Sequence, residues 1–255
     1  MCVPQTIRLI ELLKPTTAAG IDFGEMRSVY QHAVSLEIWR TWSDQRRSVC
    51  DCFADVIRAW RGDYVNTTPL LCVSNAAHEW ATQWLIANNA DSLPLVAINP
   101  GAGGPLKRWS LNRYLELADM LKVRGYRSLF IFGPKETALQ AEAMPRIDQC
   151  KWLSYSSSDS HIQSVSALLQ KCALTISNDC AVMHISAAVG TRTLGIFGPS
   201  ISEIWFPYQQ PWNQTVEHDV KCREDCLAGC NERGCLQDIS VSEVFERAML
   251  MVPKC

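Results

Sequence analysis

The chain has 255 residues, of which 47% are hydrophobic and 20% are charged; this is typical of a folded protein and too apolar for a disordered one. The formal net charge of −2 and the pI near 6.2 provide no global basic field, which excludes nucleic acid as an expected partner. The sequence contains no run of 18 apolar residues that would predict a transmembrane helix, and its first residues lack the pattern of a secretory signal. The expected location is therefore cytoplasmic.

The first ninety residues predict mainly helices. Apolar residues at helical spacing favour helices over residues 7–13, 27–42, 52–60 and 76–87, with a loop through 16–20. Convincing strands are few. We therefore interpret residues 1–92 as part of a domain and expect the complete domain to be larger.

From residue 93 onward, predicted strands alternate with predicted helices. Apolar runs predict strands over 95–98, 128–132, 152–153, 174–176 and 193–197. Helices are predicted after Ser110, around residues 138–143, over 162–169 and 183–189, and after the capping box that starts at Ser240. This alternation predicts one α/β domain over residues 93–255, with a parallel sheet covered by helices on both faces.

Ligands of such sheets bind beyond the carboxyl ends of the strands. Four predicted strand ends lead into polar or glycine-rich loops, over residues 99–109, 133–136, 177–184 and 198–202. These loops are therefore the candidate ligand-binding segments.

The loop over residues 99–109 has the composition of a phosphate site. Gly101, Gly103 and Gly104 let the backbone approach a ligand, and Lys107 and Arg108 follow just before a predicted helix. A solvated surface loop is the alternative. The glycine fingerprints of P-loop and dinucleotide-binding proteins are both absent, which disfavours a nicotinamide-dependent dehydrogenase.

Two further strand ends carry ionisable side chains. Glu136 could accept hydroxyl groups of a ribose, or simply favour the first turn of a helix. Asp179 could face a ligand or cap the next helix, and His184 by itself is better explained as a satisfied core residue.

Together these motifs resemble glycosyltransferase family 9, the lipopolysaccharide heptosyltransferases and their relatives. The resemblance rests on Asn-Pro-Gly-Ala before Lys107-Arg108-Trp109, Gly-x-x-Glu ending at Glu136, Asn178-Asp179 before Met183-His184, and Gly-Ile-Phe-Gly-Pro-Ser ending at Ser200. It covers residue 93 to the carboxyl terminus. The preceding part resembles only the last portion of that family's N-terminal domain.

The resemblance implies a GT-B architecture with two Rossmann-like domains, of which the N-terminal one would be truncated here. It implies an inverting transfer, without metal or other cofactor, of a sugar such as heptose from an ADP-activated donor to the lipopolysaccharide core at the inner membrane surface. It assigns Lys107 to donor phosphate, Glu136 to the ribose, and Asp179 with the segment through His184 to the phosphates and donor sugar. The candidate binding residues are Gly101, Gly104, Lys107, Arg108, Glu136, Asp179, Cys180, Ala181, Met183 and His184.

The sequence departs from the family in two places. Asp179 is followed by Cys180-Ala181, where the family usually has serine or threonine and then glycine. The family's general base is an aspartate beside a glycine-rich loop, and the surroundings of Asp22 and Glu25 do not match it. The catalytic residue therefore stays unassigned, and a remnant that binds the donor without transferring sugar is the alternative function.

Four cysteines near the carboxyl terminus form a separate feature. Cys222, Cys226, Cys230 and Cys235 lie within 14 residues and could bind zinc. Paired C-x-x-C motifs are absent, so we favour thiols without a metal. The two N-x-T matches, at Asn66 and Asn213, are interpreted as chance.

Overall fold

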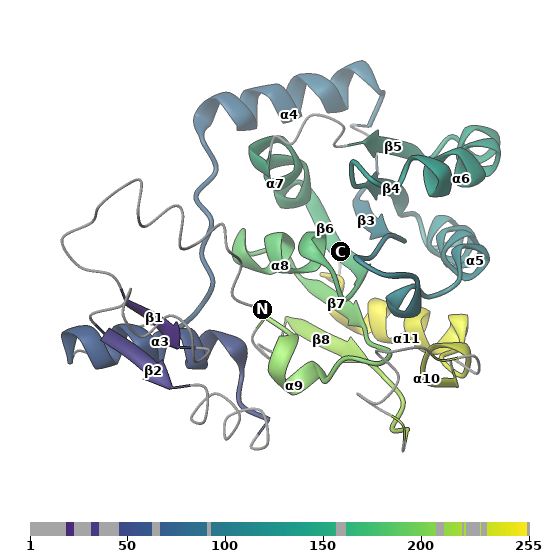
Figure 1. Cartoon of the computed structure of the whole chain (residues 1–255). Helices are drawn as coiled ribbons and strands as arrows, with labels where there is room; N and C mark the ends of the chain where they lie inside the picture. The colour runs from purple at the N-terminus through teal and green to yellow at the C-terminus, as the bar shows by residue number, and fades with distance from the viewer. Residues whose placement is uncertain are drawn as a thin grey trace. The chain divides into compact units, whose positions relative to one another are not determined.

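The structure is a computed structural model that describes residues 19–22, 32–35, 46–62, 67–90, 93–156, 162–207, 212–220, 222, 230 and 234–253. The chain forms two compact units (Figure 1). One consists of Met1–Thr68 with Glu203–Trp205, and the other of Pro69–Ser202 with Phe206–Cys255.

The first unit contains a pair of parallel strands and a helix. Strand β1 (Ala19–Asp22) pairs with β2 (His32–Ser35), and helix α3 (Val49–Arg61) follows. The Ser48 hydroxyl accepts a hydrogen bond from the Cys50 backbone N–H at the start of α3, and Gly62, with φ of 75°, ends the helix. The helix predicted over residues 52–60 is therefore confirmed.

The helix predicted over residues 27–42 is wrong where β2 lies. Short apolar stretches do not distinguish a helix from a strand by spacing, and here parallel pairing with β1 decides the outcome. The loop predicted through residue 20 is likewise replaced by β1 from Ala19 onward. The helix predicted over residues 7–13 lies outside the described residues.

The second unit contains a parallel sheet. Within the described residues the sheet has six strands in the order β5-β4-β3-β6-β7-β8, and every neighbouring pair is parallel. The strands are β3 (Leu95–Asn99), β4 (Arg127–Phe132), β5 (Leu153–Ser156), β6 (Cys172–Asn178), β7 (Thr193–Ile196) and β8 (Asn213–Val216). Strands β4 and β5 are added in sequence on one side of β3, and strands β6, β7 and β8 are then added in sequence on its other side. This order places a topological switch point between β3 and β6.

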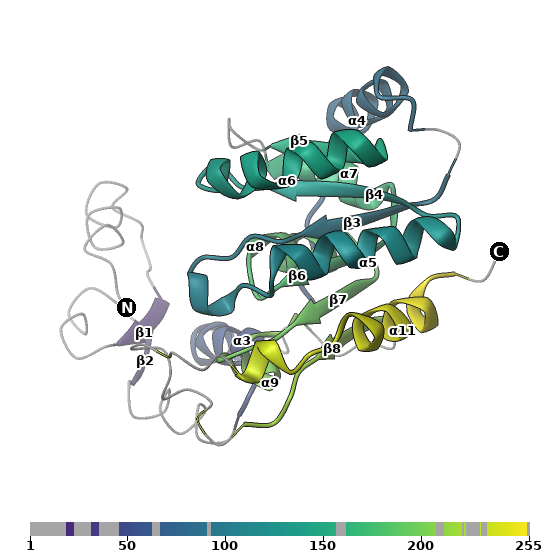
Figure 2. The ribbon, with the colours of Figure 1, turned by 90° about the vertical axis from the view of Figure 1, so that its right-hand side faces the viewer.

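Helices cover both faces of this sheet, as Figure 2 shows. One layer contains α5 (Leu111–Val123), α6 (Thr137–Cys150) and α11 (Val241–Met251), and the other contains α4 (Asn75–Ala87), α7 (Ile162–Gln170) and α8 (Ala181–Ala188). Two short helices complete the unit: η1 (Pro105–Lys107), a 3-10 turn, and α10 (Gly234–Gln237). The short helix α9 (Ser202–Trp205) belongs, apart from Ser202, to the first unit.

The central strands β3 and β4 are largely apolar on both sides because both faces are covered. In β3, Val96 and Ile98 pack with α5 and α11, while Leu95 and Ala97 pack with α4 and α7. The predicted α/β architecture with helices on both faces is thus confirmed.

Two features of this unit differ from the sequence expectations. The unit begins at Pro69, before residue 93, because α4 packs on the sheet through Ala77 and Ala81. Strand β8 was not predicted, since its sequence Asn-Gln-Thr-Val is largely polar. Asn213 is buried there, and its Oδ1 accepts a hydrogen bond from the Thr193 N–H at 3.0 Å, which gives this asparagine a structural role.

Among the described residues, no helix combines the length and apolar character needed to cross a bilayer.

Candidate functional site

A cavity of about 1040 Å³ lies at the carboxyl ends of β3, β4 and β6. It is lined by Asn99, by residues 102–108 after β3, by residues 133–136 after β4, and by residues 179–182 with His184 after β6. Three of the four loops singled out from the sequence therefore meet at the switch point of the sheet. The fourth, residues 198–202, is not part of this lining.

The glycine-rich loop after β3 is closed by one side chain. Asn178, the last residue of β6, donates through Nδ2 to the carbonyl oxygens of Pro100 at 3.0 Å and Gly101 at 3.1 Å. Its Oδ1 accepts from the Trp109 N–H at 3.0 Å. A fully buried amide thus holds both ends of the loop.

Lys107 and Asp179 form an ion pair on the wall of the cavity. Lys107 Nζ lies 2.6 Å from Asp179 Oδ2, and the two side chains are 32% and 8% exposed. Lys107 belongs to the 3-10 turn η1, ahead of α5, so the cation is held by the loop itself. Arg108 donates from one terminal nitrogen to the Ala102 carbonyl at 3.2 Å, which fixes the loop from inside.

Glu136 turns back over the start of the glycine-rich loop. Its carboxylate accepts a hydrogen bond from the Gly133 N–H at 2.7 Å. A Cβ placed on Gly101 would lie 1.7 Å from Glu136 Oε1, so residue 101 must be glycine for the carboxylate to sit there. By contrast, a Cβ on Gly103 or Gly104 would meet nothing within 4 Å, so neither glycine is required by packing within the chain.

The amino end of α8 presents Cys180, Ala181 and His184 to the cavity. The Cys180 thiol donates to Asn99 Oδ1 at 2.9 Å and lies 3.3 Å from the Ser177 hydroxyl. Burial raises the pKa of Cys180, so the thiol stays protonated and acts as a hydrogen-bonding group.

Met183 is placed differently from the other candidates. It is completely buried and packs against Phe197 and Phe206. Gly195, in the neighbouring strand, leaves room for this cluster, since a Cβ there would lie 2.9 Å from the Met183 sulfur. Met183 therefore fixes α8 against the core and does not itself line the cavity, which Val182 and His184 on either side of it do.

His184 is half-buried, and burial lowers its pKa below the ordinary 6.5. The nearby Lys107 charge lowers the pKa further, while Asp179 raises it. The ring is therefore neutral at pH 7 and can donate one hydrogen bond and accept another.

This shift predicts a pH dependence of stability. Below about pH 6.5 the unfolded chain binds a proton at His184 while the folded chain does not, so stability falls as the pH decreases from 6.5 toward the lower folded pKa. We expect the free energy of unfolding to drop more between about pH 7.5 and 5.5 in the unaltered chain than in His184→Gln. Denaturant titration at both pH values measures it, and an equal drop in both proteins would contradict the assignment.

Two asparagines at this edge were missed as site residues. Asn99 donates to the Ile131 carbonyl at 2.7 Å and accepts from Cys180, which links the carboxyl ends of β3, β4 and β6. Asn178 closes the loop as described. The available signal was an asparagine ending each of two apolar strands, where a buried amide requires hydrogen-bond partners.

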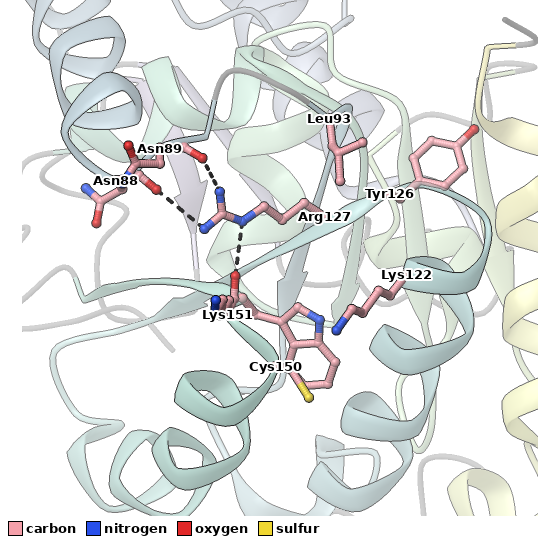
Figure 3. A pocket seen from close by; sticks show the side chains of 9 residues that line it. Asn88, Asn89, Leu93, Lys122, Tyr126, Arg127, Cys150 and Lys151 are labelled. Atoms are coloured by element: carbon pink, nitrogen blue, oxygen red, sulfur yellow. Dashed lines mark hydrogen bonds between the residues drawn. The ribbon is translucent and has the colours of Figure 1, made fainter.

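A second cavity, of about 500 Å³, lies at the opposite edge of the sheet (Figure 3). Arg127, at the start of β4, donates to the carbonyl oxygen of Lys151 at 3.1 Å and to those of Asn89 and Asn88. These carbonyls end α4 and α6, whose dipoles are negative there. Arg127 thus stabilises the carboxyl ends of these two helices, which gives it a structural role at this cavity.

The cysteine cluster gives no metal centre among the residues that can be examined. Cys235, in α10, is buried in the core, Cys222 is exposed, and Cys226 lies outside the described residues. Within the described part of the chain, no group of three potential ligands is close enough to hold a metal ion. Asp22 is the last residue of β1, and Glu25 lies outside the described residues.

The strand order and the position of the main cavity define a Rossmann-like α/β unit of the kind that binds nucleotides at its switch point. The model of glycosyltransferase family 9 (heptosyltransferase) matches residues 66–235. The chain belongs to glycosyltransferase family 9.

Curated relatives include lipopolysaccharide heptosyltransferase 2 of Salmonella typhimurium, 29% identical over 110 residues that cover 42% of this chain and 32% of the relative. Lipooligosaccharide heptosyltransferase 2 of Campylobacter jejuni is 27% identical over 160 residues, covering 60% of this chain and 50% of the relative. The matched part thus spans a third to a half of these relatives.

Solved structures show the same fold over nearly the whole chain. The E. coli ADP-heptose LPS heptosyltransferase II aligns with a TM-score of 0.75 at 19% identity, covering 97% of this chain and 73% of that one. A family 9 glycosyltransferase from Veillonella parvula aligns with a TM-score of 0.77 at 20% identity, covering 98% and 71%. The predicted GT-B-type fold is confirmed.

Proposed function

We propose that the cavity at the carboxyl edge of the sheet binds the nucleotide-sugar donor of a glycosyl transfer. The observation that carries this proposal is the meeting, in one cavity, of Lys107, Asp179, Glu136 and His184. The donor class follows from that chemistry: a cation and loop amides suit a diphosphate, and carboxylates suit the hydroxyl groups of a ribose and a sugar.

The reaction we propose transfers heptose from an ADP-activated donor to the lipopolysaccharide core, with inversion and without a metal. The oxygen of the acceptor hydroxyl bonds to the anomeric carbon of the sugar as the bond between that carbon and the phosphate oxygen breaks, and the electron pair of the broken bond goes to the departing diphosphate. Lys107, held in the wall beside Asp179, stabilises the growing negative charge on that phosphate. The acceptor grows at the inner membrane surface, so we place the reaction in the cytoplasm.

Glu136 supports recognition of the nucleoside part. Its carboxylate is held over Gly101 by the Gly133 N–H and keeps free acceptor positions for the two ribose hydroxyls. Asp179 and the neutral His184 are left to contact the donor sugar and the phosphates.

The unit that begins at Pro69 would then be the donor domain, and the residues before it would contribute to the acceptor domain. The proton of the attacking acceptor hydroxyl needs a base, for which no residue is assigned. Binding of donor without transfer is therefore the second candidate function, favoured by the unmatched surroundings of Asp22.

A transfer assay distinguishes the two functions. The purified chain is incubated with ADP-heptose and a core lipopolysaccharide that lacks heptose, and the acceptor is followed by mass spectrometry while ADP release is measured. Acceptor mass that increases by one heptose together with ADP supports transfer. Binding of donor with neither product would identify the chain as a donor-binding protein only, and absence of binding would refute both functions.

A substitution in the loop tests the placement of Glu136. Gly101→Ala should displace the carboxylate, because the new Cβ occupies its position, and should weaken nucleotide binding about two- to tenfold, the equivalent of one lost hydrogen bond. The end of a glutamate side chain can move, so the fold should persist. Calorimetry measures the affinity. In the Glu136→Ala background the same substitution should have little further effect, and an undiminished effect there would show that Gly101 acts by another route.

A further inference from the structure

The Asn178 side chain holds both ends of the glycine-rich loop that follows β3. It is fully buried, and its amide makes three hydrogen bonds of 3.0 to 3.1 Å, two to carbonyls at the start of the loop and one from the N–H at its end. The loop between these contacts runs from Pro100 to Trp109. A single amide therefore fixes both ends of a ten-residue segment to the end of β6.

Lys107 lies inside this closed segment. Its position follows from η1, where its N–H donates to the Gly104 carbonyl at 3.1 Å. Its ammonium group meets Asp179, the residue that directly follows Asn178. The amide of Asn178, the last residue of β6, thus holds the backbone of the loop, and the carboxylate of Asp179, the next residue, holds its cation.

An amide side chain is required at position 178, because it must both donate to two carbonyls and accept from one N–H. Both hydrogens of Nδ2 point at carbonyl oxygens, and Oδ1 receives an N–H, so every polar contact of the side chain is made within the loop. An apolar residue would leave two carbonyls and one N–H buried without these partners, and an aspartate would face the same carbonyls with a negative charge.

We propose that Asn178 is a positioning residue for diphosphate binding that acts through Lys107. This inference rests on the proposed donor site. It assigns to Asn178 no contact with the ligand: its effect is to hold Lys107 where a diphosphate can reach both its ammonium group and the loop amides.

The experiment compares the affinities of ADP, AMP and adenosine for the unaltered chain and for Asn178→Ala, by calorimetry. Loss of loop closure should weaken ADP binding about three- to tenfold and leave adenosine almost unchanged, since the effect travels through phosphate contacts. The same substitution in the Lys107→Ala background should change ADP affinity by less than about twofold, because the group on which Asn178 acts is then missing.

Asn213→Ala is the matched control. Asn213 is also buried and also accepts a backbone N–H, but it lies at the start of β8, away from the carboxyl edge. It should lower the melting temperature and leave ADP affinity unchanged. Asn178→Ser, whose shorter side chain cannot span both loop ends, replaces the alanine variant if that variant fails to fold.

The outcomes distinguish a failure of the role of Asn178 from a failure of the proposed donor site. Equal losses of ADP and adenosine affinity, or an undiminished loss in the Lys107→Ala background, would overturn the role of Asn178 while leaving the donor site intact. Failure of the unaltered chain to bind ADP would overturn the proposed function, and the role of Asn178 with it.

Discussion

Replacing Lys107 by alanine is expected to weaken binding of a nucleoside diphosphate by about 1.5–3 kcal/mol, roughly 10- to 150-fold, the scale of a charge-assisted hydrogen bond. Two effects combine. The phosphate loses its cation, and the Asp179 carboxylate, only 8% exposed, loses the neighbour that neutralises it. A diphosphate would then meet the uncompensated negative charge of Asp179 on the cavity wall.

The matched control is Lys122→Ala. Lys122 lies in the last turn of α5 and lines the cavity at the opposite edge of the sheet, so its removal changes the net charge equally without touching the proposed donor site. ADP titration of both variants measures the difference. Unchanged ADP affinity in Lys107→Ala, or an equal loss in Lys122→Ala, would mean that the cavity at the switch point does not hold the phosphates.

Changing Cys180-Ala181 to Thr-Gly is expected to tighten donor binding about tenfold. A threonine hydroxyl can keep the hydrogen bond to Asn99 Oδ1 now made by the thiol, and it donates and accepts more strongly than sulfur. Glycine at the first position of α8 removes a Cβ from the cavity wall and lets a phosphate approach the helix amides. Each new hydrogen bond contributes about 0.5–1.5 kcal/mol.

The melting temperature distinguishes a loop that binds the donor from a loop that only caps helix α8. Glycine in a helix costs up to about 1 kcal/mol, so the double variant should melt at a slightly lower temperature while binding more tightly. Affinity and melting temperature are measured on the same protein. An altered melting temperature with unchanged affinity would make this loop only a helix cap and remove it from the donor site.

The sheet could be predicted from the sequence because its strands are local and apolar. Residues 95–98 and 129–132 form unbroken apolar runs, since both faces of these two central strands are covered and these side chains are buried. The polar edge strand β8 carries no such signal. Strand β2 is predicted as part of a helix because its four residues carry no signal that distinguishes a strand from a helix. Its conformation is decided by pairing with β1, which the local sequence does not reveal.

The candidate site divides in the same way. Lys107, Glu136 and Asp179 could be singled out because each follows a strand end within a recognisable motif. The roles of Asn99 and Asn178 depend on contacts with partners far along the chain: Trp109 is 69 residues from Asn178, and Pro100 is 78 residues away. Which buried amide meets which carbonyl is set by the register between β3 and β6, and no local pattern contains it.

The central claim is that the carboxyl edge of this sheet binds the diphosphate of a sugar nucleotide. Calorimetric titration of the unaltered chain with ADP, UDP, GDP and NAD tests it most directly. We expect one binding site per chain for a nucleoside diphosphate, with ADP preferred, and an affinity for ADP that falls when Lys107 is replaced by alanine. Absence of binding by every diphosphate, or tighter binding of NAD than of ADP, would contradict it.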